Sequence, residues 1–124
     1  MKTKFFEAAR SVAMVSKGIG KRKNFRHGAV IVNKNKILSV GHNSYKTHPI
    51  MAKYTIFPHL HAEQSAIINL GLFNCAGTDL YVVRINRQND FMMSKPCIVC
   101  KRLIDEITIR NVYYTDRQGE YSIL

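Results

Sequence analysis

The sequence lacks any apolar run approaching the ~18 residues of a membrane-spanning helix, so we expect no membrane span. Met1–Lys4 is basic, but Glu7 and Arg10 interrupt the apolar stretch that follows, which argues against a secretory signal. Only three cysteines are present, and this number is more typical of metal ligands or free thiols than of a disulfide framework. These absences together predict a cytoplasmic protein with no membrane partner.

Acidic residues are also scarce, because 8 Asp and Glu stand against 19 Lys and Arg, which gives a formal net charge of +11. The resulting field attracts polyanions, so nucleic acid, nucleotide phosphates and anionic surfaces are candidate partners. A basic enzyme with a small phosphorylated substrate explains the charge equally well. Charge alone therefore identifies no partner, because it acts first on solubility and on the rate of encounter.

The length of 124 residues and the 46% hydrophobic content suit one compact domain, residues 1–124. Apolar periodicity predicts helices at 3–17, 61–73 and 97–107, and strands at 28–32, 37–40, 80–85, 112–115 and 121–124. This order favours an α/β fold with one sheet and helices on both faces. Strands that are separated by single helices should run parallel, which brings the starts of the second and third helices to the same edge of the sheet.

The residues with the clearest chemical meaning lie at those two helix starts. His61-Ala62-Glu63 begins one predicted helix, and Pro96-Cys97-Ile98-Val99-Cys100 begins the other. Cysteines three residues apart share a helical face, so both sulfurs can reach one ion, and a helix N-terminus lowers thiol pKa values. Three such ligands with one open position are typical of catalytic zinc, whereas structural zinc has a fourth protein ligand.

The combination of His-x-Glu with a later Pro-Cys-x-x-Cys resembles the signature of the cytidine and deoxycytidylate deaminase superfamily, which includes tRNA adenosine deaminases and polynucleotide cytidine deaminases. The resemblance covers nearly the whole chain. It implies a three-layer αβα cytidine deaminase-like fold with a mixed five-stranded sheet. It also implies a Zn²⁺ cofactor held by His61, Cys97 and Cys100, with Glu63 as the catalytic proton shuttle. A homo-oligomer is compatible with it, because small members of this superfamily often assemble.

The resemblance also implies substrate contacts. Asn43, in Gly41-His42-Asn43, matches an asparagine that contacts the substrate sugar, and backbone groups of Ala62 and of the loop at Lys95 and Pro96 would hold the pyrimidine edge. The loop that borders the pocket in related enzymes contains Phe25, Arg26 and His27. An aromatic residue among cations suits base stacking and phosphate contacts, although a packed Phe in a solvated basic loop explains the sequence equally well.

Other potential ligands keep a non-catalytic interpretation open. His42, His48 and His59 precede His61, and they suit loop hydrogen bonds, a phosphate contact or a second metal. A structural zinc or nucleic-acid-binding module would need a fourth protein ligand, for which His59 and Cys75 are the nearby candidates. Otherwise Cys75 is expected to be a buried thiol.

Three functions follow from these features. The first is hydrolytic deamination of cytosine in a free nucleotide, which the compact chain and the long loop 41–60 favour. The second is deamination of cytosine or adenine in single-stranded DNA or RNA, which the net charge favours. The turn at 116–119 predicts a tight return into an antiparallel last strand, and this feature resembles the free-nucleoside branch of the superfamily. The third is a non-catalytic zinc-binding nucleic-acid module.

Overall fold

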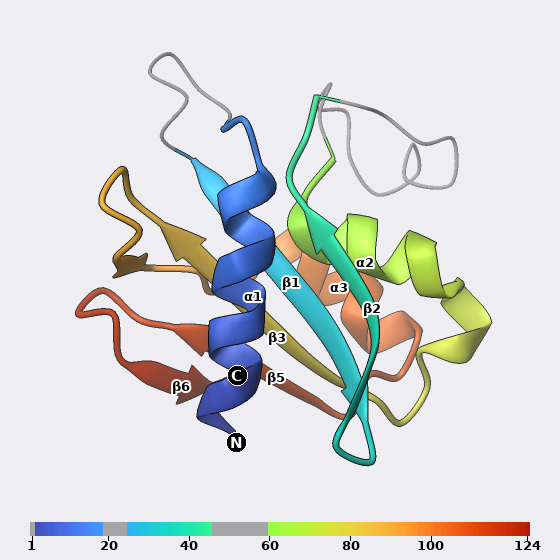
Figure 1. Cartoon of the computed structure of the whole chain (residues 1–124). Helices are drawn as coiled ribbons and strands as arrows, with labels where there is room; N and C mark the ends of the chain where they lie inside the picture. The colour runs from blue at the N-terminus through green and yellow to red at the C-terminus, as the bar shows by residue number, and fades with distance from the viewer. Residues whose placement is uncertain (1, 19–24, 46–59) are drawn as a thin grey trace.

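A computed structural model describes residues 2–18, 25–45 and 60–124 of the chain. Its helices are α1 (Thr3–Val15), α2 (Ala62–Leu70), the short 3₁₀ helix η2 (Leu72–Asn74) and α3 (Ile98–Glu106). Its strands are β1 (Arg26–Asn33), β2 (Lys36–His42), β3 (Asp79–Ile85), β4 (Phe91–Met92), β5 (Asn111–Thr115) and β6 (Tyr121–Ile123). They form one mixed sheet in the order β2-β1-β3-β5-β6, and β4 also pairs with β3 (Figure 1).

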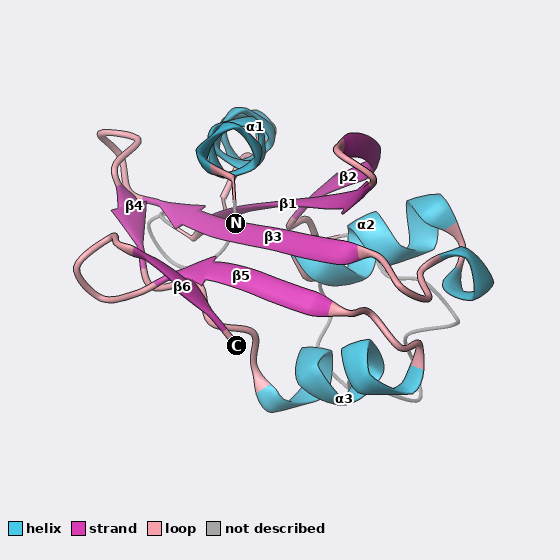
Figure 2. Ribbon diagram, turned by 90° about the horizontal axis from the view of Figure 1, so that it is seen from below, coloured by secondary structure: helices cyan, strands magenta, loops and turns pink. Residues whose placement is uncertain are grey.

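Helices cover both faces of this sheet, with α1 on one face and α2 and α3 on the other (Figure 2). Successive side chains of a strand point to opposite faces, so β1 contributes to two cores. Ala29 and Ile31 pack on the side of α2 and α3, whereas Val30 and Val32 pack on the side of α1. The three-layer α/β fold is therefore confirmed.

Two glycines let the helices approach the sheet closely. A Cβ atom at Gly28 would lie 2.1 Å from the carbonyl oxygen of Ala9 in α1. A Cβ atom at Gly41 would lie 2.3 Å from the backbone nitrogen of Ala66 in α2. Because any side chain would collide with helix backbone at these positions, the two glycines set the distance of α1 and of α2 from the sheet.

The strand directions agree with the sequence analysis. The pair β3 and β5, which α3 connects, is parallel, and β5 and β6 are antiparallel, as the tight return at 116–119 predicts. Strand β1 lies between β2 and β3 and is antiparallel to both. No helix in the described ranges combines the length and the apolar character needed to cross a membrane.

The structure corrects two details. The predicted helix 61–73 ends at Leu70, because Gly71 has a φ of 97° and its backbone N–H donates to the Ile67 carbonyl. Phe73, which helical periodicity placed on the buried face, is 100% exposed. The connection 86–95, for which the sequence predicts no strand, contains β4, which adds a short sixth strand.

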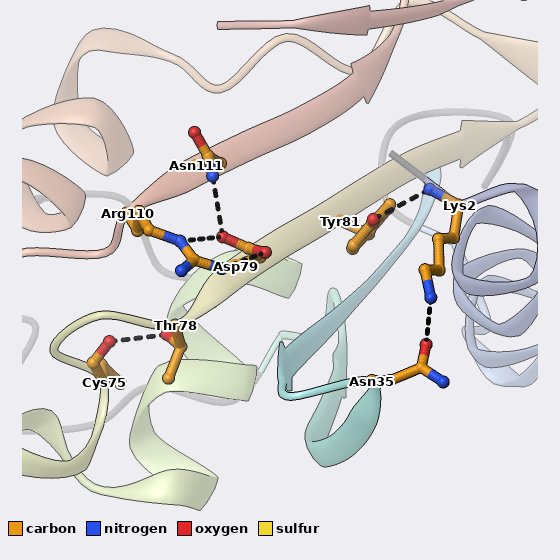
Figure 3. Close-up of polar contacts among 8 residues, drawn as sticks. All are labelled: Lys2, Asn35, Cys75, Thr78, Asp79, Tyr81, Arg110 and Asn111. Atoms are coloured by element: carbon orange, nitrogen blue, oxygen red, sulfur yellow. Dashed lines mark hydrogen bonds and ion pairs between the residues drawn. The ribbon is translucent and has the colours of Figure 1, made fainter.

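Hydrogen bonds at the start of β3 tie it to its neighbours (Figure 3). Asp79 accepts hydrogen bonds from Arg110 and from the Asn111 side chain, which lies at the start of β5. The Tyr81 hydroxyl accepts one from the backbone nitrogen of Lys2, just before α1, at 3.1 Å. Hydrogen bonds between side chains, and one to the backbone of Lys2, therefore hold this end of the sheet together.

Candidate metal centre and active site

Three potential metal ligands meet where α2 and α3 begin. The ligand atoms of His61, Cys97 and Cys100 all lie within 4.8 Å of one another. His61 Nδ1 is 3.2 Å from Cys100 Sγ and 3.7 Å from Cys97 Sγ. The fold therefore brings the imidazole of His61 to the same point as the two thiols, which lie much further along the chain.

Backbone contacts place the His61 side of this cluster. Leu60 forms an antiparallel bridge with Ser44, just after β2, so the residues that precede α2 lie beside the end of that strand. His61 is the N-cap of α2, and its backbone N–H donates to Gln64 Oε1 at 2.9 Å. This hydrogen bond satisfies a backbone donor at the helix start and orients His61.

The cysteine side is anchored through Ser94. Its buried hydroxyl donates to the Val82 carbonyl of β3 at 2.8 Å and accepts from the Thr115 backbone N–H of β5 at 2.8 Å. Cys97 is the N-cap of α3, and Cys100 lies one turn further on the same face. The segment that leads into α3 is therefore tied to two central strands.

The electrostatics of the cluster suit a cation. Hydrogen bonds from Cys100 and His61 lower the pKa of the Cys97 thiol to about 3. The hydrogen bond to Cys97, followed by burial, raises the pKa of Cys100, and the hydrogen bond with Cys97 raises that of His61. Cys97 therefore forms a thiolate readily. A bound cation would replace the protons that Cys100 and His61 donate to this thiolate. One imidazole and two thiolates form a ligand set that zinc prefers.

Glu63 lies in the first turn of α2, beside the cluster, and only 5% of its surface is exposed. Burial is the main cause that raises the pKa of its carboxyl group, and its side chain also forms a hydrogen bond with Cys100. Its carboxylate does not belong to the group of three potential ligands. A carboxyl group that is buried beside a metal site without being a ligand is suited to proton transfer.

Asn43 connects three segments around the site. Its Oδ1 accepts from the Ser16 hydroxyl at 2.7 Å and from the His27 backbone N–H at 2.9 Å, and its Nδ2 donates to the Phe25 carbonyl. The side chain thereby fastens the start of β1 to the end of β2 and to the segment after α1. Its contact with a substrate sugar stays a prediction; among the described residues, only one of its two amide hydrogens has an acceptor.

The three loop residues predicted to bind substrate have different surroundings. Arg26 is turned toward the connection after β3, where its guanidinium donates to the Asn86 carbonyl and to Asn89 Oδ1. Burial, followed by the charge of Arg84, lowers the pKa of His27 to about 4. Phe25 is 42% exposed, and the Arg84 guanidinium carbon lies 4.5 Å from the centre of its ring.

Sequence reasoning missed Arg84. It falls within the predicted buried strand 80–85, yet a cation among apolar residues is a signal that this position differs from its neighbours.

The remaining candidates can be placed as follows. Ala62 and Pro96 are buried and Lys95 is exposed, all beside the helix starts. His42 Nδ1 lies 3.1 Å from the carbonyl of the next residue. Cys75 is fully buried, as predicted, and is not part of the three-ligand cluster. Within the described ranges the cluster has no fourth protein ligand, and His48 and His59 lie outside those ranges.

Comparison with known proteins agrees with the geometry. Residues 1–116 match the family model of the cytidine and deoxycytidylate deaminase zinc-binding region. No curated protein matches the chain by sequence.

Solved structures share the fold. A cytidine deaminase from Burkholderia pseudomallei has a TM-score of 0.67 and 20% identity, over 100% of this chain and 92% of its own. The dCMP deaminase of cyanophage S-TIM5, in complex with dCMP and dUMP, has a TM-score of 0.63 and 22% identity, and the match covers 94% of this chain and 85% of that chain. A structure from work on A-to-I editing by tRNA:A34 deaminases has a TM-score of 0.58 and 24% identity, and the match covers 94% of this chain and 79% of that chain.

Proposed function

Because the chain belongs to the cytidine and deoxycytidylate deaminase family of zinc-dependent hydrolases, we propose that it deaminates cytosine in a free cytidine or deoxycytidine nucleotide. The products would be the uracil nucleotide and ammonia. The convergence of His61, Cys97 and Cys100 at one point beside the buried Glu63 is the observation on which this proposal rests.

His61, Cys97 and Cys100 would hold the metal. When bound, zinc supplies a water-derived nucleophile at neutral pH. Glu63 would accept one proton from the attacking water and deliver it to the ring nitrogen of cytosine. It would then take the second proton of that water and pass it to the departing amine, which leaves as ammonia. Burial supports this role, because it raises the pKa of the Glu63 carboxyl group and so makes the group a stronger proton acceptor than an exposed carboxylate.

The groups around the cluster would orient the base. Ala62 lies in the first turn of α2 and Pro96 directly precedes the N-cap of α3, so backbone groups from both helix starts, with Lys95, would face a ring bound above the metal. Asn43 would contribute through its remaining amide hydrogen. Its hydrogen bonds to the start of β1 would also keep His27 and Phe25 at the rim.

Ammonia release from dCMP, cytidine and a short cytosine-containing single-stranded oligonucleotide tests the proposal. We expect turnover of dCMP that disappears after stringent zinc stripping and returns when zinc is added. Full activity in the stripped protein would contradict the proposal. So would the absence of ammonia release from all three substrates when zinc is present.

Deamination of a base in single-stranded nucleic acid is the second candidate, and the net charge of +11 favours it. It predicts activity on the oligonucleotide alone, falling steeply as salt is raised. Binding releases cations from the phosphates, and a higher salt concentration makes that release less favourable. A weak dependence on salt together with turnover of dCMP favours the free nucleotide.

A further inference from the structure

Arg84 and His27 form a pair beside the metal-binding cluster. They are cross-strand partners at the ends of β3 and β1. Alternation along the strands puts them on the same face as Leu80 and Ala29, which is the face covered by α2 and α3. Val82, two residues before Arg84 in β3, accepts a hydrogen bond from Ser94 in the segment that leads into α3. The charges of His61 and Cys97 also act on the His27 imidazole, so the pair lies near the cluster.

Arg84 has no carboxylate to balance its charge among the described residues. The ion pairs found there are Arg10–Glu7, Lys101–Asp105 and Arg110–Asp79. The segments 19–24 and 46–59 contain no Asp or Glu in their sequence. In addition, Arg84 Nε is buried and has no hydrogen-bond partner within the described ranges. A buried donor without a partner destabilises a protein, and an anionic ligand would supply the missing acceptor.

Phe25 holds the guanidinium in place. The guanidinium carbon lies 4.5 Å from the centre of the ring, within the range of a cation–π contact. The contact is made with the ring and uses none of the N–H donors of the guanidinium in a hydrogen bond. The neighbouring Arg26 is already bound to Asn86 and Asn89, so it does not compete for the same anion.

On the basis of the function proposed above, we propose that Arg84 binds a phosphate group of the substrate at the rim of the metal site, with Phe25 as its support. A guanidinium recognises phosphate through parallel N–H donors, and Arg84 would bind the group in this way. The phosphate is either the 5′-monoester of a free nucleotide or a phosphodiester of a single strand. In both cases Arg84 selects a phosphorylated substrate over a nucleoside.

Binding of products to the zinc-loaded protein tests this inference without turnover. Calorimetric titrations with dUMP and deoxyuridine compare two ligands that differ only by the phosphate. We expect the wild type to bind dUMP more tightly. Arg84→Gln should weaken dUMP binding by roughly 10- to 100-fold, the range for one hydrogen bond to a charged group, and should leave deoxyuridine binding within about twofold.

Arg87→Gln is the matched control, because it removes the same charge from an exposed position just after β3. It should leave the preference for dUMP unchanged. Phe25→Leu keeps Arg84 and removes only its support, so it should weaken dUMP binding by a smaller factor. Melting temperatures of all variants are measured beside the titrations, and the Phe25 variant carries the test if Arg84→Gln does not fold.

An oligonucleotide with a single deoxyuridine identifies the source of the phosphate. A loss in Arg84→Gln confined to dUMP assigns the monoester, and a loss confined to the oligonucleotide assigns the phosphodiester. Wild-type binding of deoxyuridine as tight as that of dUMP and of the oligonucleotide would overturn the inference and leave the proposed deaminase intact. A preference retained in Arg84→Gln, or lost equally in Arg87→Gln, would also overturn it. Failure of all three ligands to bind would contradict the proposed function as well.

Discussion

Strand β3 has a charged side chain near each end, and the two ends differ in how that charge is held. At the start, Asp79 accepts hydrogen bonds from Arg110 Nε at 3.2 Å, from Arg110 Nη2 at 3.0 Å and from Asn111 at 3.1 Å (Figure 3). At the other end, Arg84 rests on the Phe25 ring and has no carboxylate partner within the described ranges. The first end satisfies its charges internally, whereas the second leaves one for a ligand.

Burial of ionisable groups separates the two ends in the same way. At the metal-site end, burial raises the pKa of Glu63 and lowers that of His27 to about 4. Both shifts come chiefly from loss of water, and both oppose the charged form. Such destabilised groups are typical of functional sites. Substitutions at the metal-site end should therefore reduce activity or ligand binding more than stability, and substitutions at the Asp79 end should do the reverse.

The largest expected effect is the loss of activity in Glu63→Gln. We expect the rate of ammonia release to fall by roughly 10³-fold or more, because no other buried carboxyl group stands beside the cluster in the described ranges. The free energy of unfolding should not decrease, since a neutral amide of similar size replaces a carboxyl group that burial disfavours in its charged form. Activity, zinc content and urea unfolding are measured on the same preparation. Loss of stoichiometric zinc in this variant would contradict the assignment of Glu63 as a residue that is not a ligand.

The second effect concerns His27 and pH. Its pKa is about 4 in the folded protein and 6.5 in the unfolded chain, so the unfolded chain binds more protons between these values. The stability linked to His27 is therefore complete above pH 6.5 and is lost as the pH falls toward 4. The loss at pH 4 amounts to about 3 kcal/mol.

Urea unfolding of the wild type and of His27→Gln at pH 7 and pH 4 isolates this contribution, because the other titrating groups are common to both proteins. The wild type should lose more stability on acidification than the variant, by up to that amount. Equal losses in the two proteins would show that the pKa of His27 is not lowered in the folded protein.

A smaller effect is expected at the opposite end of β3. Asp79→Asn keeps the shape of the side chain and removes its charge, so it should lower the free energy of unfolding by about 1 kcal/mol. Nucleotide binding should not change. Asp105→Asn serves as a control, because its ion pair with Lys101 is exposed on both sides and should contribute less. If Asp79→Asn altered the preference for dUMP over deoxyuridine, the two ends of β3 would not differ in their role in ligand binding.

Much of the site could be predicted because its information is local. The ligands lie at helix starts, and residues three apart on a helix share a face whatever the rest of the chain does. The alternation of strands and helices then brings those starts together. His61, Cys97 and Cys100 were thus assigned from spacing and resemblance, and the structure places their ligand atoms within 4.8 Å.

Features that depend on long-range pairing were not predictable in the same way. Strand β4 has only two residues and exists because Met92 and Phe91 pair with Arg84 and Ile85 across a turn. Asn43 was assigned to the sugar from its motif, yet its contacts with Ser16, Phe25 and His27 depend on how three separate segments meet. No local pattern encodes such contacts.

Phe73 gives the smallest expected effect and tests a position that helical periodicity places on the buried face but that the structure exposes. Its side chain is 100% exposed and lies at the edge of a hollow of about 600 Å³ whose lining includes Ile68, Leu72 and Ile107. Phe73→Ser should change the free energy of unfolding by less than about 0.5 kcal/mol, as for other surface substitutions. Urea unfolding at two protein concentrations provides the measurement. A loss of about 1.5–3 kcal/mol that grows with concentration would mean that a second copy covers the ring, since burial of a phenyl group contributes that much.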